Sequence, residues 1–175
     1  VIDENLDYNE FIKIPFTTKF DLTDSNSEFR AVPLQKITEY ATTSGTSGKP
    51  ITMYLTANDL ERLAYNEASS LRKIGATSDD VIQLMTTMDR QFMAGLAYFL
   101  GVQKLGAGMV RIGPGVPSLQ WQSIIENEVT VLIAVPSFIV QLLNFAQQND
   151  IDFKSTKVKK ILAIGEPIRD TEFNL

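Results

Sequence analysis

The sequence predicts an α/β fold in which a mostly parallel sheet carries helices on both faces, preceded by a β-rich segment that holds a Ser/Gly loop. Three observations support this prediction. Stretches typical of strands alternate with stretches typical of helices over residues 51–164, as in successive β-α-β units. The runs at 129–135 and 161–164 are apolar on both faces, which suits strands buried between two helix layers. A chain of 175 residues also has the size for one core.

The first 34 residues are expected to form an irregular lead-in. Pro15 and Pro33 discourage long elements around them, and residues 21–28 are polar and typical of turns. Alternation at 35–42 predicts a strand, and the β-branched and aromatic residues at 51–56 predict another. The Ser/Gly loop therefore lies between two strands.

The remaining elements follow in regular order. Thr56 and Asp59 resemble a capping box, so a helix is expected to begin there and to stop near Gly75. Ser137 is expected to cap a helix over 137–149. The other expected elements are strands at 81–86, 109–112, 129–135 and 160–164, and helices at 92–105 and 118–128.

Composition and charge exclude several classes of function. The chain has no Cys and no His, which excludes disulfide scaffolds, thiolate zinc sites, Cys nucleophiles and His-based triads. Sixteen Lys and Arg against 21 Asp and Glu give a net charge of −5, so no nucleic-acid partner is expected. The four lysines within 154–160 are interpreted as a solvated connection. No apolar stretch reaches the roughly 18 to 20 residues of a membrane span, so no membrane partner is expected either.

Residues 43–50 (TSGTSGKP) carry the densest chemistry of the chain. Glycines let consecutive backbone N–H groups face an anion, hydroxyls add hydrogen bonds, and Lys49 adds a charge suited to phosphate. The pattern therefore favours a phosphate-binding loop. A flexible Ser/Gly hairpin loop remains the alternative on spacing alone.

This loop differs from the P-loop of nucleotide triphosphatases. Its glycines are separated by two residues instead of four, and Lys49 is followed by Pro50 where a P-loop has Ser or Thr. A strand, not a helix, is expected to follow. The pairs Gly106/Gly108 and Gly113/Gly115 lack the context of a dinucleotide site, and turn chemistry explains them.

The loop and its flanking segments resemble the adenylate-forming superfamily and, within it, phenylacetate–coenzyme A ligases. The similar segments occur in the family's order over residues 14–167: IPFTTKFDL at 14–22, FRAVPLQKI at 29–37, GLAYFLGVQKLGAGMVRIGPG at 95–115, VTVLIAVPSFIVQLL at 129–143 and KKILAIGEP at 159–167.

The resemblance implies an AMP-forming ligase that uses ATP and Mg²⁺ to activate an aryl or acyl carboxylic acid as an acyl-adenylate, and then transfers the acyl group to coenzyme A. It implies that the ATP phosphates lie on Thr43, Ser44, Gly45, Thr46, Ser47, Gly48 and Lys49. It places Gly165, Glu166 and Pro167 on the adenine side. It also suggests an acyl pocket formed by Phe92, Ala94, Gly95, Val135, Pro136 and Ala163, although core packing explains the same residues.

The family continues past its Gly-Glu-Pro segment into a Tyr-Gly-x-Ser/Thr-Glu segment and a mobile domain with a catalytic Lys, and neither occurs here. We therefore expect residues 35–175 to be part of a nucleotide-binding domain truncated at both ends, with no catalytic residue and no metal ligand of its own, and inactive alone. The parent enzyme is expected in the cytoplasm. Apolar surface left uncovered would favour a homodimer. Two alternatives remain: a relative that passes the acyl group to an acceptor other than coenzyme A, and a non-catalytic α/β assembly module.

Overall fold

The computed structural model describes residues 7–43 and 49–168 and contains a four-stranded parallel sheet. Its strands are β3 (Val81–Leu84), β4 (Gly108–Arg111), β5 (Val131–Ala134) and β6 (Lys160–Ala163). They lie in the order β4-β3-β5-β6, so β3 and β5 are central. Ile82 pairs with both Met109 and Val131, which fixes the register of the three strands.

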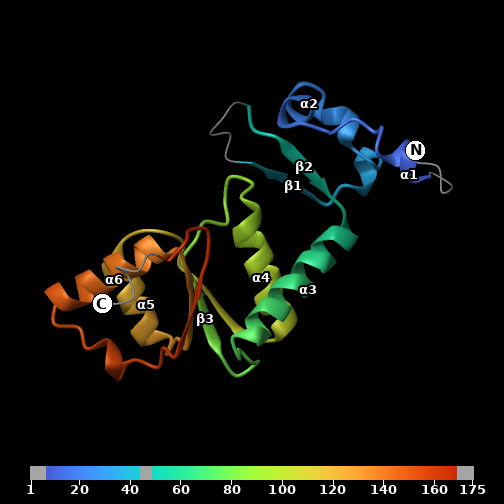
Figure 1. Cartoon of the computed structure of the whole chain (residues 1–175). Helices are drawn as coiled ribbons and strands as arrows, with labels where there is room; N and C mark the ends of the chain where they lie inside the picture. Colours follow the sequence, from blue (N-terminus) through green and yellow to red (C-terminus); the bar gives the residue numbers. More distant parts are fainter. Residues whose placement is uncertain (1–6, 44–48, 169–175) are drawn as a thin grey trace.

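Two pairs of helices cover the two faces of this sheet (Figure 1). Helices α3 (Ala57–Lys73) and α4 (Met93–Leu105) cover one face, and α5 (Pro117–Glu126) and α6 (Pro136–Gln148) cover the other. The predicted fold class is therefore confirmed.

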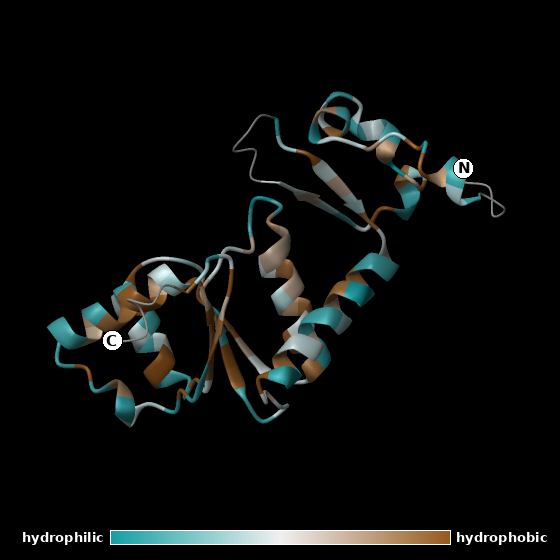
Figure 2. Ribbon diagram, viewed as in Figure 1, coloured by the Kyte–Doolittle hydropathy of each residue, from teal (hydrophilic) through white to brown (hydrophobic). Residues whose placement is uncertain are grey.

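Successive residues of each central strand enter different cores, because side chains alternate along a strand. Val131 and Ile133 pack with Leu71 of α3 and Val102 of α4. Leu132, between them, packs in a second core with residues of α5 and α6. Figure 2 shows brown residues in the central strands and in the helices on both sides of the sheet. The run at 129–135 is therefore continuously apolar because β5 is buried on both faces, each against a different core.

An antiparallel hairpin, β1 (Glu39–Thr42) and β2 (Thr52–Leu55), precedes the sheet. Thr42 pairs with Thr52, so the Ser/Gly loop connects the two strands at the end of the hairpin. The strand expected from residue 35 begins only at 39, because residues 34–36 form the 3₁₀ turn η2 (Leu34–Lys36).

The lead-in is more ordered than the sequence suggested. It contains α1 (Tyr8–Phe11), α2 (Lys19–Asp24) and the 3₁₀ helix η1 (Asn26–Phe29). The expected irregular segment contains short helices because side chains cap two of them: Asp7 caps α1, and Thr18 and Asp21 form a capping box at α2. None of these short elements contains a buried residue.

Three other details concern helix ends and an edge strand. The capping box at α3 is confirmed, and hydrogen bonds from the backbone N–H and hydroxyl of Thr56 lower the pKa of the Asp59 carboxyl. Ser137 does not cap α6, because the helix already begins at Pro136. Ile161 is 47% exposed, so the apolar run at 161–164, which was expected to be buried on both faces, is not. The reason is that β6 is an edge strand of the described sheet.

A further 3₁₀ turn, η3 (Phe153–Ser155), lies between α6 and β6. Across the described ranges, no helix combines the length and the apolar character that a bilayer crossing requires.

Candidate functional site

All four strands of the parallel sheet end at one edge, and five of the predicted site residues, 135, 136 and 165–167, follow the ends of β5 and β6. Parallel strands in α/β folds place ligand-binding loops at this carboxyl edge. Val135 follows β5 and Gly165 lies two residues after β6. The strand ends are held in register, since Ile164 N donates to Ala134 O at 3.0 Å.

The base of the Ser/Gly loop is closed by Thr43. Its backbone N donates to Ile51 O at 3.1 Å, and its hydroxyl accepts from Ile51 N at 3.1 Å. Thr43 is thus engaged in closing the loop through both groups. Residues 44–48, to which phosphate roles were also assigned, lie outside the described residues.

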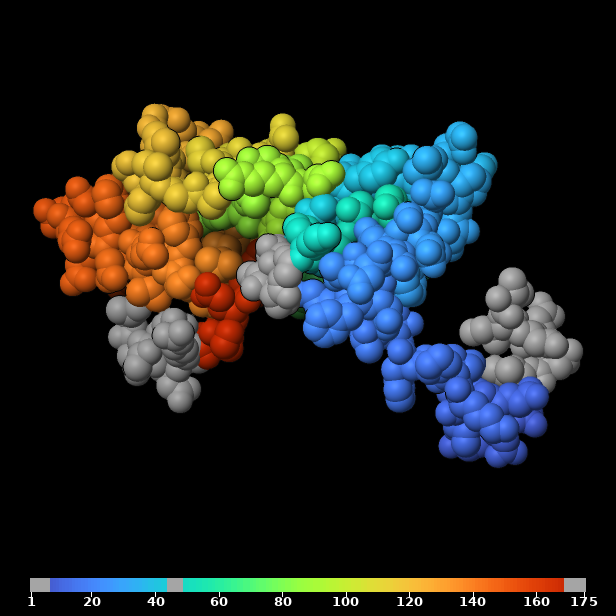
Figure 3. All heavy atoms as spheres, turned by 90° about the horizontal axis from the view of Figure 1, so that it is seen from above, coloured from blue at the N-terminus to red at the C-terminus, as the bar shows by residue number. Residues whose placement is uncertain are grey.

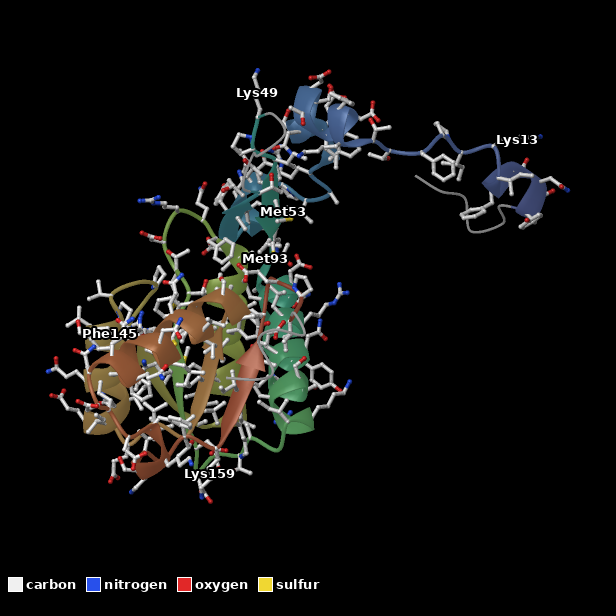
Figure 4. The ribbon with its side chains drawn as sticks, turned by 60° about the vertical axis from the view of Figure 1, so that its left-hand side comes forward. Lys13, Lys49, Met53, Met93, Phe145 and Lys159 are labelled. Carbon is white, nitrogen blue, oxygen red and sulfur yellow. The ribbon has the colours of Figure 1, made fainter. Side chains whose placement is uncertain are left out.

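Lys49 lies three residues before β2, which begins at Thr52, and is exposed. In Figure 4 its side chain extends from the end of the hairpin into solvent. A primary ammonium held this way is able to meet a phosphate group as a point charge.

A backbone hydrogen bond connects the hairpin to the carboxyl edge of the sheet. Thr42 N donates to Gln91 O at 3.0 Å, and Gln91 belongs to the loop between β3 and α4. Seen from above, the cyan hairpin adjoins the bright green segment around residue 90 (Figure 3). This contact brings the base of the Ser/Gly loop to the edge where the strands end.

The loop that receives this contact has an uncommon backbone. Arg90 and Gln91 have φ values of 54° and 59°, in the left-handed region that non-glycine residues seldom occupy. Such conformations cost about 1–3 kcal/mol each and are found where the surrounding structure fixes them, often at functional sites. Sequence reasoning missed both residues, because nothing in their residue types signals a left-handed backbone.

The predicted adenine-side residues form an exposed turn after β6. Gly165 has φ +74°, and a Cβ at this position would lie 3.4 Å from Val135 Cγ1. The Glu166 carboxylate reaches the start of α6, where it accepts from Ser137 N at 3.1 Å and from Ser137 Oγ at 3.0 Å. The turn is therefore attached to the element that follows the neighbouring strand.

The six predicted acyl-pocket residues lie at the same edge, on three different elements. Phe92 and Ala94 are at the start of α4, Val135 and Pro136 are at the start of α6, and Ala163 ends β6. Gly95 serves close packing: a Cβ there would come within 1.9 Å of Thr87 O. Its role as pocket lining stays a prediction.

A buried polar chain, which sequence reasoning also missed, supports the loop after β4. Gln83 Nε2 donates to Gln120 Oε1 at 2.8 Å, and Gln120 Nε2 donates to Gly113 O at 2.8 Å and Gly115 O at 3.1 Å. Gln83 is fully buried in a central strand. A lone amide in the apolar run 81–86 was the available signal, because a buried amide needs partners.

Acidic residues do not gather into a metal site in the part of the chain that the structure describes: no three of them come together there. Mg²⁺ is often held by only one or two carboxylates together with substrate phosphates, so the metal stays an expectation for the parent enzyme.

The chain is similar to curated phenylacetate–coenzyme A ligases. It is 31% identical to the enzyme of Aromatoleum evansii over 160 residues, which is 90% of this chain and 36% of the relative. It is 30% identical to the enzyme of Escherichia coli K12 over 142 residues, 81% of this chain and 32% of the relative. The chain thus spans about a third of the length of the curated relatives that it matches.

Solved structures of CoA ligases share its fold. A 2-hydroxyisobutyryl-CoA ligase in complex with 2-HIB-AMP and CoA aligns with a TM-score of 0.78 and 21% identity over 87% of this chain and 34% of that one. The o-succinylbenzoate CoA synthetase of Bacillus subtilis, in complex with AMP, aligns with a TM-score of 0.61 and 23% identity over 77% of this chain and 26% of that one. The family model described as AMP-binding enzyme matches residues 23–172, and the chain belongs to this family.

Proposed function

We propose that this chain is the phosphate-loop and sheet-edge part of an ATP-dependent, AMP-forming carboxylate–CoA ligase that acts on an aryl or acyl acid. In that reaction a carboxylate oxygen attacks the α-phosphorus of ATP and pyrophosphate leaves. The thiol sulfur of coenzyme A then attacks the acyl carbonyl carbon, and AMP leaves. Membership of the family and the similarity to phenylacetate–CoA ligases support the proposal.

The observation that carries the proposal is the position of the Ser/Gly loop. It is a hairpin connection closed by Thr43 and joined to the β3–α4 loop through Thr42 N and Gln91 O. The two ends of the loop, Thr43 and Lys49, are described, and the hydroxyls, glycines and lysine of its sequence suit the charge that develops on a leaving pyrophosphate. The loop residues 43–49 are accordingly proposed to hold the ATP phosphates.

The other site assignments are proposals with the same basis. Residues 165–167 are proposed to lie beside the adenine, and the residues at the starts of α4 and α6 to border the acid. The unit formed by residues 35–175 is proposed as the nucleotide-binding part, with residues 1–34 as its lead-in. Because this unit spans about a third of its relatives, we expect no ligase turnover from the 175-residue chain alone.

Calorimetric titration with pyrophosphate tests the phosphate role of Lys49. Losing one exposed ammonium–phosphate contact should weaken binding about fivefold in Lys49→Ala, and added salt should reduce the difference. Lys154→Ala is the matched control, because Lys154 is equally an exposed lysine but lies in η3. Equal dissociation constants for wild type and Lys49→Ala would remove the proposed role of the loop cation.

A further inference from the structure

Helix α6 begins without the cap that its own sequence would supply. Pro136, its first residue, has no N–H group, and Val135 before it offers no side-chain acceptor. Phe138 N and Ile139 N both donate to Val135 O, at 3.0 and 3.2 Å. Ser137 N is the first-turn amide that needs an acceptor from elsewhere.

Glu166 supplies that acceptor from 29 residues further along the chain. Its Oε2 accepts from Ser137 N at 3.1 Å, and its Oε1 accepts from Ser137 Oγ at 3.0 Å. Both carboxylate oxygens are therefore engaged by one residue. The positive end of the helix dipole also partly offsets the charge of the carboxylate.

This pair of contacts fixes the turn that follows β6. Gly165 lies between the strand and Glu166 with φ +74°, so the chain reverses there under a conformation that suits glycine. Fixing Glu166 to α6 fixes the backbone of Gly165 at the same edge. Because both oxygens of its carboxylate are turned toward Ser137, Glu166 is placed to support the turn, and the Gly165 backbone and the Pro167 ring are the groups assigned to a ligand.

We propose that Glu166 is a positioning residue that acts through Ser137: it holds the 165–167 turn in place for the adenosine part of the nucleotide without contacting the nucleotide itself. This inference rests on the proposed function, which puts the nucleotide at this edge. It adds Ser137 to the site. It also makes Glu166 a residue that supports the 165–167 turn, where a direct contact with the ligand was expected.

The test uses the whole 175-residue chain and two probes, AMP for the adenosine side and inorganic pyrophosphate for the phosphate loop. Glu166→Ala should bind AMP about fivefold more weakly, the factor that matches loss of a typical helix cap, and should bind pyrophosphate as wild type does. Glu166→Gln should bind AMP nearly as wild type, because an amide can accept from Ser137 N and donate to Ser137 Oγ. Glu126→Ala, which removes an exposed carboxylate from α5, is the control for net charge.

A double-mutant cycle separates support from direct contact. If Glu166 acts through Ser137, Ser137→Ala combined with Glu166→Ala should bind AMP no more weakly than Glu166→Ala alone. Hydrogen exchange should become faster at the amides of residues 164–166 and of Ser137 in Glu166→Ala, with the amides of β3 and β5 unchanged.

Several results would overturn the inference. They are unchanged AMP binding in Glu166→Ala, additive effects of the two substitutions, a Glu166→Gln variant as weak as Glu166→Ala, or a parallel loss of pyrophosphate binding. Wild-type chain that binds pyrophosphate but not AMP would overturn this inference and leave the phosphate loop standing. Wild-type chain that binds neither would overturn the proposed function as well.

Discussion

The body of the molecule and its N-terminal region are stabilised in different ways. The body, from α3 to β6, has two apolar cores on either side of one sheet. The described residues of the N-terminal region, 7–43 and 49–55, include no buried residue in the helices, and their buried apolar residues are Ala41 and Ile51, in or beside the hairpin. Polar contacts organise it instead, such as the two hydrogen bonds between Asn26 and the backbone of Thr52.

This difference teaches how the candidate site is assembled. A well-packed sheet provides a carboxyl edge whose positions are fixed by burial. A lightly packed hairpin brings the base of the proposed phosphate loop to that edge through α3 and the hydrogen bond from Thr42 N to Gln91 O. Segments with few buried contacts open at lower free energy than core strands. The hairpin is therefore the part of the site expected to adjust when a ligand binds.

The largest expected effect comes from removing apolar volume in the body. Leu84→Ala should lower the free energy of unfolding by about 3 kcal/mol, because Leu84 is fully buried in a central strand. Phe16→Ala, at a side chain that is 95% exposed, should change it by less than about 0.5 kcal/mol. Urea unfolding measures both, and similar losses in the two variants would contradict the proposed contrast between the regions.

Next in size is the close contact between α4 and the end of β3. Gly95→Ala should destabilise the chain by about 2 kcal/mol, because the added Cβ would come within 1.9 Å of Thr87 O. Gly108→Ala is the matched control: its Cβ would meet Val81 Cγ2 at an ordinary 3.5 Å. Thermal unfolding distinguishes them, and a Gly95→Ala variant as stable as Gly108→Ala would refute the close approach.

A smaller, pH-dependent effect is expected at the opposite edge of the sheet. Burial of the Asp80 carboxyl opposes its ionisation, but hydrogen bonds from Thr130 and Thr77 and the nearby Lys160 ammonium outweigh burial and lower its pKa below 3.8. Between the folded pKa and 3.8 the unfolded chain binds more protons, so this stabilisation is complete above 3.8 and is lost as the pH falls through the folded pKa.

Asp80→Asn should consequently cost about 1–2 kcal/mol at pH 7. The deficit should shrink as acid protonates Asp80 in the wild type. Urea midpoints at pH 7 and pH 3 measure this change, with Asp79→Asn as the neighbouring control. A deficit that stays the same at both pH values would argue against an ionised, hydrogen-bonded Asp80.

The smallest effect is expected in the N-terminal region. Asn26→Ala removes the side chain that pairs with Thr52 N and Thr52 O, each at 3.0 Å, and should cost about 1 kcal/mol. Hydrogen exchange should become faster in β2 and stay unchanged in β5. Faster exchange in both strands would mean that the hairpin and the body unfold together, and the contrast between them would fail.

Most of the strands and helices could be predicted from the spacing of apolar residues along the chain. The apolar run at 129–135 predicted a buried strand, and the capping box at Thr56 and Asp59 predicted the start of α3. Both signals are local, because each depends only on residues that lie close together in the sequence. The loop chemistry of residues 43–50 was equally readable, because hydroxyls, glycines and a lysine stand next to one another.

The sequence by itself determined the order of strands and helices over residues 51–164 and the chemistry of the Ser/Gly loop. It also excluded Cys nucleophiles and His-based triads, because the chain has neither residue. Only the tertiary structure decided that Glu166 engages the start of α6, that Gln91 receives the hairpin, and that β6 lies at an edge. The physical reason is distance along the chain. A helix cap from a distant residue, or the edge position of a strand, depends on which remote segment packs beside it. Local residue patterns do not contain that information.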